Sequence, residues 1–367
     1  MAVQVEGRKV RYAVVGAGWI SQAAFMPGVA HTGNSELTAI VTGDHRKAEA
    51  LGRRYGITRT YHYDAYLAAL DSAGFDALYI AVPNGQHRDY AIPALDRGLH
   101  VLLEKPMAVT EEDCRAITAA ARQGGAKLMI GYRLHFEPAT LEAVRLVQSN
   151  ALGRVRLFSS TFTQHVAFEN HRAQNGFWAG PVADMGPYPI NAARHLFGAE
   201  PVEVMAWGAR TQGFGFHDTV SVLLRFPEER LAQFTVAYGL NAVDTYRVVG
   251  TEGDLQVSPG FGFDARLRHR LTVGESTIET AFPEVDQFGG ETAYFSACIL
   301  QDLEPEPDGE EGRLDVRVVA AVGRALETGQ SQALAPVQRT KRPHPDQARN
   351  LLPVKSPPLF HAAAPGG

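Results

Sequence analysis

The chain has 367 residues, of which 45% are hydrophobic and 20% charged, and its formal net charge is -5. This length exceeds that of one typical domain and suits two domains, each with a core of its own. The charge gives the chain no overall attraction to nucleic acid or to an anionic membrane, so we expect neither partner.

The hydrophobic runs and the cysteines further limit the class of protein to which this chain can belong. The first apolar run, residues 10–15, is too short for a signal sequence or a membrane span. The two cysteines, Cys114 and Cys298, are far apart in the sequence, which argues against a disulfide framework. The 13 histidines include no HxxxH or HExxH pattern, so we expect no metal. We therefore expect a cytoplasmic protein.

Short apolar runs alternate with helical patterns between residues 8 and 132. The strand-like runs are VRYAVV, ELTAIVT, FDALYIAV, HVLLE and AKLMIGY. This alternation predicts a doubly wound parallel sheet, that is, an α/β Rossmann domain over residues 8–132. The segments 82–85 and 104–106 follow strands and should lie at the carboxyl edge of the sheet, where such folds bind ligands.

The pattern becomes β-rich after a helix expected at about 138–148. Runs such as RVRLFSSTFTQHV, TVSVLLRF and LAQFTVAYG predict an α+β domain over residues 133–335 with a large, open-faced, mainly antiparallel sheet. Two helices are expected late in this domain, and the acidic residues 304–311 between them are expected to form a solvated loop. Residues 336–367 are expected to form an extended or disordered tail.

A glycine-rich turn follows the first strand. In the run Gly16-Ala17-Gly18-Trp19-Ile20-Ser21, Gly16 permits a tight turn and Gly18 lets the backbone approach a pyrophosphate. Ser21 stands where the dinucleotide fingerprint prefers Gly or Ala. An ordinary turn is the alternative, but the position at the start of a βαβ series favours a nucleotide site.

The end of the second strand indicates which nucleotide binds. An NAD enzyme places Asp or Glu there for the ribose 2′-OH, but this chain has Thr42 and Gly43, followed by Arg46 and Lys47. The missing acid and the nearby cations favour NADP over NAD. The alternative is that Arg46 and Lys47 only form a solvated helix face.

Three segments together resemble a known family. GAGWIS, VPNGQH and EKPMAV, in this order and spacing, resemble the Gfo/Idh/MocA oxidoreductases, and DMGPYPINAARHLFG is similar to the glucose-fructose oxidoreductase and aldose-aldose oxidoreductase group. The resemblance covers roughly residues 10–330. It implies a sugar substrate, with Lys105 beside the nicotinamide and with Asp184 and Tyr188 as its catalytic partners.

The resemblance also implies how these residues act. Tyr188 and Lys105 handle the hydroxyl proton, and Asp184 orients the ring hydroxyls. From the residues alone, Tyr188 could instead be a buried phenol and Asp184 a helix N-cap. Further candidate cofactor contacts are Tyr61, Pro83, Asn84, His87, Glu104, Arg133 and Arg172.

Residues 170–181 depart from the close relatives, so the sugar is left open. The expected reaction is oxidation of an aldose at C1 to a lactone, with or without reduction of a second sugar by retained NADP. The alternatives are a dissociating dehydrogenase or reductase acting on xylose, an anhydro-sugar or a dihydrodiol, and a non-catalytic nucleotide sensor. A homo-oligomer, dimer or tetramer, is expected through the open sheet.

Overall fold

The computed structural model describes residues 7–72 and 74–366. The chain forms two compact units. The first comprises the chain up to Arg133, Val285–Arg313 and Arg349–Ala364. The second comprises Leu134–Glu284, Leu314–Ala348 and the residues from Pro365 onward.

A parallel sheet forms the centre of the first unit, in the strand order β3-β2-β1-β4-β5-β6. Its strands are β1 (Val10–Val15), β2 (Ser35–Val41), β3 (Arg59–Tyr61), β4 (Ala77–Ile80), β5 (His100–Glu104) and β6 (Leu128–Gly131). Its helices are α1 (Met26–Val29), preceded by the π-helical turn η1 (Ser21–Phe25), α2 (His45–Tyr55), α3 (Tyr66–Leu70), α4 (His87–Leu95), α5 (Glu111–Gln123) and α10 (Gln287–Leu300), with 3-10 turns η2 (Tyr63–Ala65) and η3 (Asn84–Gln86). The strand order and the parallel pairing confirm the Rossmann prediction.

Residues predicted for the second domain return to this parallel sheet. On α10, Ser296 lies 2.8 Å from both the Tyr12 hydroxyl on β1 and the Ser35 hydroxyl on β2. The predicted boundary therefore differs from the observed division, because buried hydroxyls on strands β1 and β2 need a partner. The tail also divides, with residues 336–348 in the second unit and 349–364 in the first.

The second unit is built on a nine-stranded sheet in the order β14-β13-β12-β11-β7-β10-β9-β8-β15. Its strands are β7 (Val155–Gln164), β8 (Glu203–Ala209), β9 (Thr219–Phe226), β10 (Arg230–Tyr238), β11 (Val243–Gly250), β12 (Gly253–Val257), β13 (Arg268–Val273), β14 (Ser276–Ala281) and β15 (Gln332–Ala333). Its helices are α6 (Pro138–Gln148), α7 (His171–Gln174), α8 (Pro181–Asp184), α9 (Pro187–Phe197) and the larger part of α11 (Gly309–Thr328), with 3-10 turns η5 (Phe177–Ala179), η6 (Pro227–Glu229) and η7 (Pro345–Gln347). Another 3-10 turn, η4 (Arg133–Phe136), begins at Arg133 of the first unit and continues with residues that belong to the second unit.

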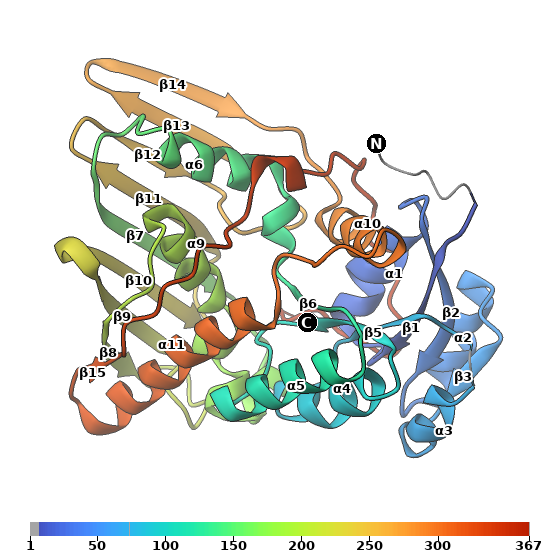
Figure 1. Ribbon diagram of the computed structural model, residues 1–367. Coiled ribbons are helices and arrows are strands. Elements are labelled where there is room, and N and C mark those ends of the chain that lie inside the picture. The colour runs from blue at the N-terminus through green and yellow to red at the C-terminus, as the bar shows by residue number, and fades with distance from the viewer. Residues whose placement is uncertain (1–6, 73, 367) are drawn as a thin grey trace. The chain divides into compact units, whose positions relative to one another are not determined.

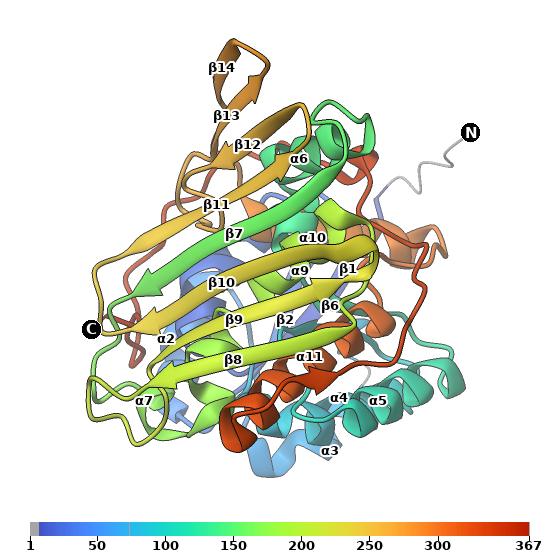
Figure 2. The same ribbon diagram turned by 90° about the vertical axis from the view of Figure 1, so that its left-hand side faces the viewer.

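Alternation along β9 explains why the sheet has one open face. Val220, Val222 and Leu224 are buried, whereas Ser221 and Leu223 between them are exposed. Helices α6 and α9 lie behind the sheet, and Figure 2 shows the other face uncovered. One pairing departs from the predicted antiparallel meander, since β10 and β7 run parallel.

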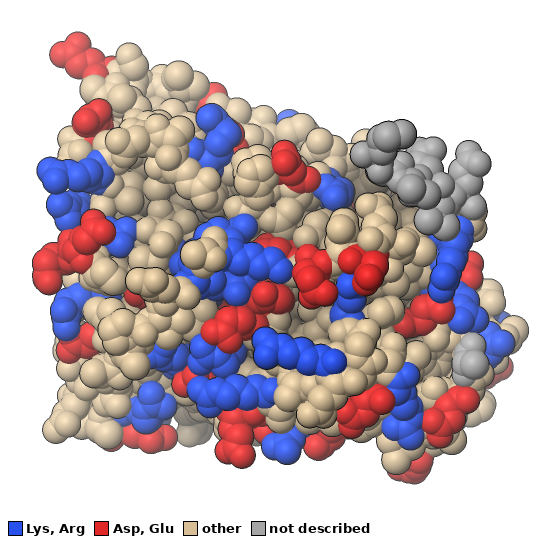
Figure 3. Space-filling view, in the orientation of Figure 1, with Lys and Arg blue, Asp and Glu red and all other residues tan. Residues whose placement is uncertain are grey.

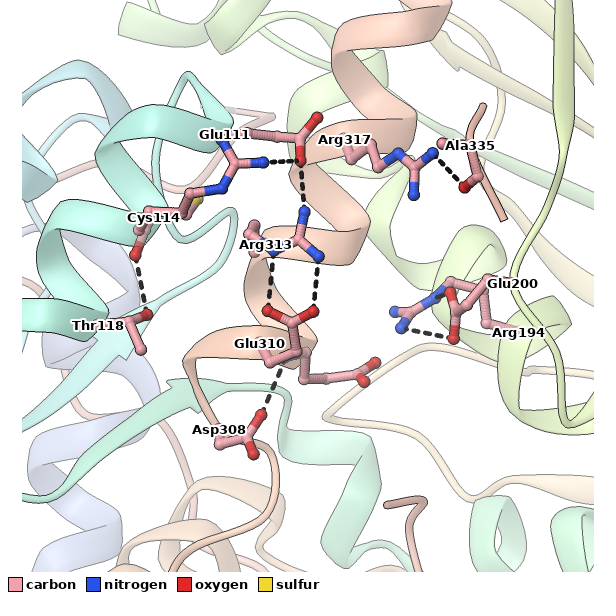
Figure 4. Close-up of polar contacts among 12 residues, drawn as sticks. Glu111, Cys114, Thr118, Arg194, Glu200, Asp308, Glu310, Arg313, Arg317 and Ala335 are labelled. Atoms are coloured by element: carbon pink, nitrogen blue, oxygen red, sulfur yellow. Dashed lines mark hydrogen bonds and ion pairs between the residues drawn. The ribbon is translucent and has the colours of Figure 1, made fainter. Parts of the chain in front are cut away.

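The acidic residues 304–311 are not the fully solvated loop that the sequence predicts. Glu306 and Glu311 are buried, and α11 begins at Gly309, within the acidic run. Arg313 explains part of the local order, because it donates to Glu310 at 2.6 Å and also bonds Glu111 on α5 (Figure 4). A buried acid needs such polar partners, which local composition does not reveal.

The molecular surface agrees with the near-balanced composition. On the face drawn in Figure 3, Lys and Arg side chains are interspersed with Asp and Glu. Among residues 7–72 and 74–366, no helix is both long enough and apolar enough to cross a bilayer.

Arg194 on α9 is the centre of a buried ion network in the second unit. Its guanidinium is fully buried, lies 2.5 Å from Glu200 and also bonds Asp315 on α11. Arg342 adds a second cation 2.9 Å from Glu200. The folded state needs all of these paired charges, because removing one partner leaves a buried charge without its counter-ion, which is strongly destabilising.

We predict that Arg194→Met lowers the free energy of unfolding by about 3–5 kcal/mol, because it leaves two buried carboxylates with fewer cations. Urea denaturation followed by circular dichroism measures the change. Arg145→Met, which removes an exposed pair with Glu142, is the control and should cost less than about 1 kcal/mol. Equal effects of the two substitutions would contradict this role of the network.

Candidate active site

The glycine turn after β1 has the geometry that a phosphate-binding turn requires. Gly16 has φ 92°, and a Cβ at that position would lie 2.5 Å from the Ala81 carbonyl oxygen, so other residues are excluded. Apart from the chain neighbours of Gly18, no atom of the described residues lies within 4 Å of a Cβ built at this position, which leaves its backbone open to a ligand. Ser21, which stands where the fingerprint prefers Gly or Ala, is buried and donates to the Gly16 carbonyl at 2.5 Å, so the serine stabilises the turn. Trp19 and Ile20 are half-buried beside it.

The turn after β2 holds the residues predicted to select NADP. Thr42 is buried, Gly43 is exposed, and Asp44 is the N-cap of α2, accepting from the Lys47 backbone N–H at 3.0 Å. The Lys47 side chain is half-buried, and this burial lowers its pKa although the Asp44 carboxylate opposes the shift. Arg46, by contrast, is exposed.

Tyr63, which the sequence analysis did not select, lies against this turn. A Cβ at Gly43 would meet the Tyr63 ring at 3.2 Å, and the Tyr63 pKa is raised by burial and lowered in part by a hydrogen bond to Thr42. Tyr61 was the expected contact, but its hydroxyl donates to Ser72 at 3.3 Å. The sequence Tyr-His-Tyr at residues 61–63 contains nothing that indicates which of its two tyrosines lies against Gly43.

His87 links two loops at the carboxyl edge of the parallel sheet. Its ring is fully buried, with Nε2 3.0 Å from the Val82 carbonyl and Nδ1 3.3 Å from the Met107 carbonyl. Burial lowers its pKa to about 4, so the ring is neutral near pH 7. These contacts give His87 a positioning role. Pro83 and Asn84 stand at the start of η3 in the same loop.

Glu104 ends strand β5, and Lys105 follows it directly. Glu104 accepts from the Tyr79 hydroxyl at 2.7 Å and from the Lys105 backbone N–H at 3.2 Å. Burial raises the pKa of Glu104, and the Lys105 charge counteracts part of that shift. The Lys105 side chain is half-buried, which suits a lysine that exchanges protons with a bound hydroxyl.

Arg133 is buried rather than a surface residue. It bonds the Gln287 side chain, and its guanidinium lies 5.9 Å from the centre of the Phe288 ring on α10. On the same helix Glu291 is fully buried, and neither of its carboxyl oxygens has a hydrogen-bond partner in the described chain. Its pKa is raised well above the usual range, first by burial and then by the nearby Glu104 charge. Gln287 and Glu291 were missed because the sequence assigned α10 to the other domain.

Asp184 of the second unit receives donors from three elements. Its Oδ2 accepts from Arg172 Nε at 3.0 Å, from the Tyr238 hydroxyl at 3.0 Å and from Gln164 Nε2 at 3.3 Å. Arg172, expected to contact the cofactor, is therefore bonded to the predicted catalytic carboxylate. Burial lowers the Arg172 pKa, but the Asp184 charge, the nearby Tyr238 and the hydrogen bond to Asp184 together outweigh burial, and the net pKa is raised.

The parallel pairing of β7 and β10 brings two of these donors together. Gln164 and Tyr238 end the two strands and are register partners. Register partners in a parallel pair project to the same side of the sheet, so both side chains reach Asp184. Tyr238 was missed by sequence reasoning, and the only available signal was a tyrosine that ends a strand just before a glycine.

Tyr188 lies in the first turn of α9, which begins at Pro187 as predicted. Its half-buried ring packs against Phe162 and Phe261, with centroid distances of 5.6 and 5.8 Å. Asp184 is not the N-cap of this helix, because Gly186 holds that position and Asp184 ends the short helix α8. The N-cap alternative for Asp184 is therefore wrong.

Family models match both units of the chain. A model described as "Oxidoreductase family, NAD-binding Rossmann fold" matches residues 10–132, and the "GFO/IDH/MocA C-terminal domain" matches residues 140–256. The first range contains the glycine turn, and the second contains Asp184 and Tyr188.

Individual relatives extend the similarity over most of the chain. The D-xylose 1-dehydrogenase [NADP(+)] of Haloarcula marismortui is 31% identical over 331 residues, 87% of this chain and 91% of the relative. The trans-1,2-dihydrobenzene-1,2-diol dehydrogenase of Mus musculus is 30% identical over 258 residues, 68% of this chain and 74% of the relative. The crystal structure of aldose-aldose oxidoreductase from Caulobacter crescentus, complexed with glycerol, has a TM-score of 0.83 and 34% identity, and the match covers 89% of this chain and 100% of that chain. The chain belongs to the Gfo/Idh/MocA oxidoreductase family.

Proposed function

We propose that this oxidoreductase oxidises an aldose at C1 to the lactone with NADP as the hydride acceptor. The observation that supports a sugar substrate best is the Asp184 carboxylate, which Arg172, Tyr238 and Gln164 hold in one orientation. A fixed carboxylate is a good acceptor for sugar hydroxyls, because its hydrogen bonds are charge-assisted. The named activities of the Haloarcula and Caulobacter relatives support the aldose.

The residues of the first unit fit NADP. The open backbone at Gly18 accommodates a pyrophosphate, and no acid ends β2 to bind a ribose 2′-OH. Asp44, the nearest acid, already caps α2. Thr42, Gly43 and Lys47 would hold the 2′-phosphate, and the loops of Pro83 and Glu104 would lie under the nicotinamide. The NADP(+) in the name of the xylose dehydrogenase supports the same choice.

The proposed chemistry needs a proton acceptor and a substrate clamp. Bound NADP supplies the hydride acceptor at C4 of its nicotinamide. Tyr188 and Lys105 handle the C1 hydroxyl proton together: the phenol passes its own proton toward solvent as it takes that of the C1 hydroxyl, and Lys105 donates a hydrogen bond to the same oxygen. Asp184 holds the neighbouring hydroxyls. The products are the lactone, reduced cofactor and one proton, so electrons and atoms balance.

We also propose that two copies associate through the open face of the nine-stranded sheet. This face exposes Leu157, Leu223, Leu231 and Trp207, whose exposed fraction is 65%. Trp207 and Leu223 are among the residues that line a hollow of about 480 Å³ on this face, formed by β7, β8, β9, β10, β11 and β12. An exposed apolar face of this kind is typical of an association surface.

Lys105→Met tests the proposed catalytic role. We predict a fall of kcat/KM for aldose oxidation of about 10²- to 10⁴-fold, because the proton transfer loses its lysine. The measurement is NADPH formation over a panel of aldoses, with bound nucleotide checked by absorbance and fluorescence. Lys9→Met, at an exposed lysine of the same unit, should have no effect.

Four outcomes of that assay decide between functions. Turnover that needs added NADP favours a dissociating dehydrogenase, whereas nucleotide that co-purifies and cycles between an aldose and a ketose favours a retained cofactor. Full activity of Lys105→Met would contradict the assignment. No turnover by the wild-type protein on any sugar would instead favour a nucleotide-binding sensor.

Tyr238→Phe tests whether the donors to Asp184 matter for catalysis. Loss of a hydrogen bond to a charged group costs about 1.5–3 kcal/mol, so kcat/KM should fall about 10- to 100-fold. The matched control is Tyr246→Phe, at a buried tyrosine of the neighbouring part of the sheet, which should leave kcat/KM within about threefold. Similar losses in the two variants would indicate a general effect of the buried hydroxyl.

Trp207→Asp tests the proposed association surface. A charge on this apolar face should shift the protein toward the monomer, as measured by light scattering after size exclusion. Leu67→Asp places the same charge on an exposed leucine of the first unit and should not change the mass. Unchanged mass for Trp207→Asp would rule out this face as the contact.

A further inference from the structure

The C-terminal segment 356–361 lies on the helices that follow β1 and β2. The Ser356 hydroxyl donates to the Ala23 carbonyl at 2.8 Å, and Arg54 on α2 donates to the Pro358 carbonyl at 2.7 Å. Arg54 also lies 4.2 Å from the centre of the Phe360 ring. Figure 2 shows the red end of the chain passing beside α2.

Gln22 attaches this segment to the glycine turn. Its side-chain amide donates to the Phe360 carbonyl at 3.0 Å and to the Ala17 carbonyl of the turn at 2.9 Å. Its side-chain oxygen accepts from the Phe360 N–H at 2.8 Å. Gln22 is fully buried, so both polar ends of its amide are used to fix the backbone of Phe360 beside the turn.

His361 completes the contact at the turn after β2. Its Nδ1 lies 2.8 Å from Asp44 Oδ2, while Asp44 Oδ1 accepts from the Lys47 backbone N–H. The backbone of His361 has φ 43°, a conformation that a non-glycine residue keeps only where contacts hold it. The segment is therefore fixed at the two turns that bind the adenosine half of a dinucleotide in this fold.

The Asp44 carboxylate disfavours the binding of NADP, and His361 can reduce this effect. A carboxylate in the turn after β2 attracts the 2′-OH of NAD and repels the 2′-phosphate of NADP. With the imidazole on Oδ2 and the Lys47 N–H on Oδ1, the carboxylate has a donor on each oxygen. Its pKa is lowered, first by the Lys47 backbone hydrogen bond and then by His361.

We propose that residues 356–361 form a wall of the 2′-phosphoadenosine site and that His361, by covering Asp44, makes this site prefer NADP over NAD. The inference rests on the proposed use of NADP. It adds residues near the end of the chain to a site that the glycine turn and the end of β2 were expected to form alone.

His361→Ala in the full chain tests the proposal through nucleotide binding rather than turnover. The Kd of NADPH and of 2′,5′-ADP, measured by fluorescence and calorimetry, should rise about 10-fold or more. The substitution removes the hydrogen bond between His361 and Asp44, and it uncovers the Asp44 charge that repels the 2′-phosphate. The Kd of NADH should be unchanged or lower. His344→Ala, at a histidine with a similar Asp346 pair in the second unit, should change none of these values.

The variant Asp44→Asn completes a double-mutant cycle. If His361 acts by covering the Asp44 charge, its removal should cost less NADPH affinity in the Asp44→Asn background than in the wild type. Equal losses in both backgrounds, or an unchanged NADPH to NADH preference in His361→Ala, would overturn the proposal while the proposed function stands. If the wild-type protein binds neither nucleotide, the proposed function fails and this inference fails with it.

Discussion

A carboxylate that is removed from water must be matched by donors, and the candidate substrate site depends on how this is done for Asp184. Arg172 comes from α7, while Tyr238 and Gln164 end two strands that are far apart in sequence. They meet because β10 and β7 pair in parallel, which brings both carboxyl ends to one edge of the sheet. The single parallel pairing among the described strands of this sheet thus determines where two of the donors to Asp184 meet.

The same requirement operates at Asp44 in the first unit, with a different result. Asp44 keeps partial exposure, and its donors come from the first turn of α2 and from the end of the chain. Asp184 has a guanidinium as its main partner and remains a fixed acceptor. Asp44, with a donor on each oxygen, instead offers less charge to a ligand. The two partly buried carboxylates therefore differ in how their charge is compensated, Asp184 at the end of α8 and Asp44 at the N-cap of α2.

Features that depend on local sequence were predicted well. The glycine turn, the Rossmann strands, the start of α9 at Pro187 and the alternation of β9 all depend on neighbours within a few residues. Tyr238 was missed because its partner Asp184 is distant in sequence. The burial of Glu291 and Glu306 was missed because it depends on how the chain packs and not on local composition. Tyr63 was not selected for another reason: Tyr61 ends β3 and Tyr63 comes two residues later, and only the path of the chain shows that the Tyr63 ring lies against Gly43.

The return of α10 and of residues 349–364 to the parallel sheet has a thermodynamic consequence. Ser296 joins β1 and β2, and Gln22 joins the glycine turn to Phe360, so the nucleotide-binding unit is complete only when C-terminal residues are in place. A ligand that binds this complete form, and not a form with the segment released, stabilises the docked segment by RT ln(1 + [L]/Kd). Linkage also works in reverse, and each contact that holds Phe360 and His361 raises the fraction of protein that is ready to bind. Gln22 couples nucleotide binding to docking of the segment, because its buried amide bonds both the Ala17 carbonyl of the turn and the Phe360 carbonyl of the segment.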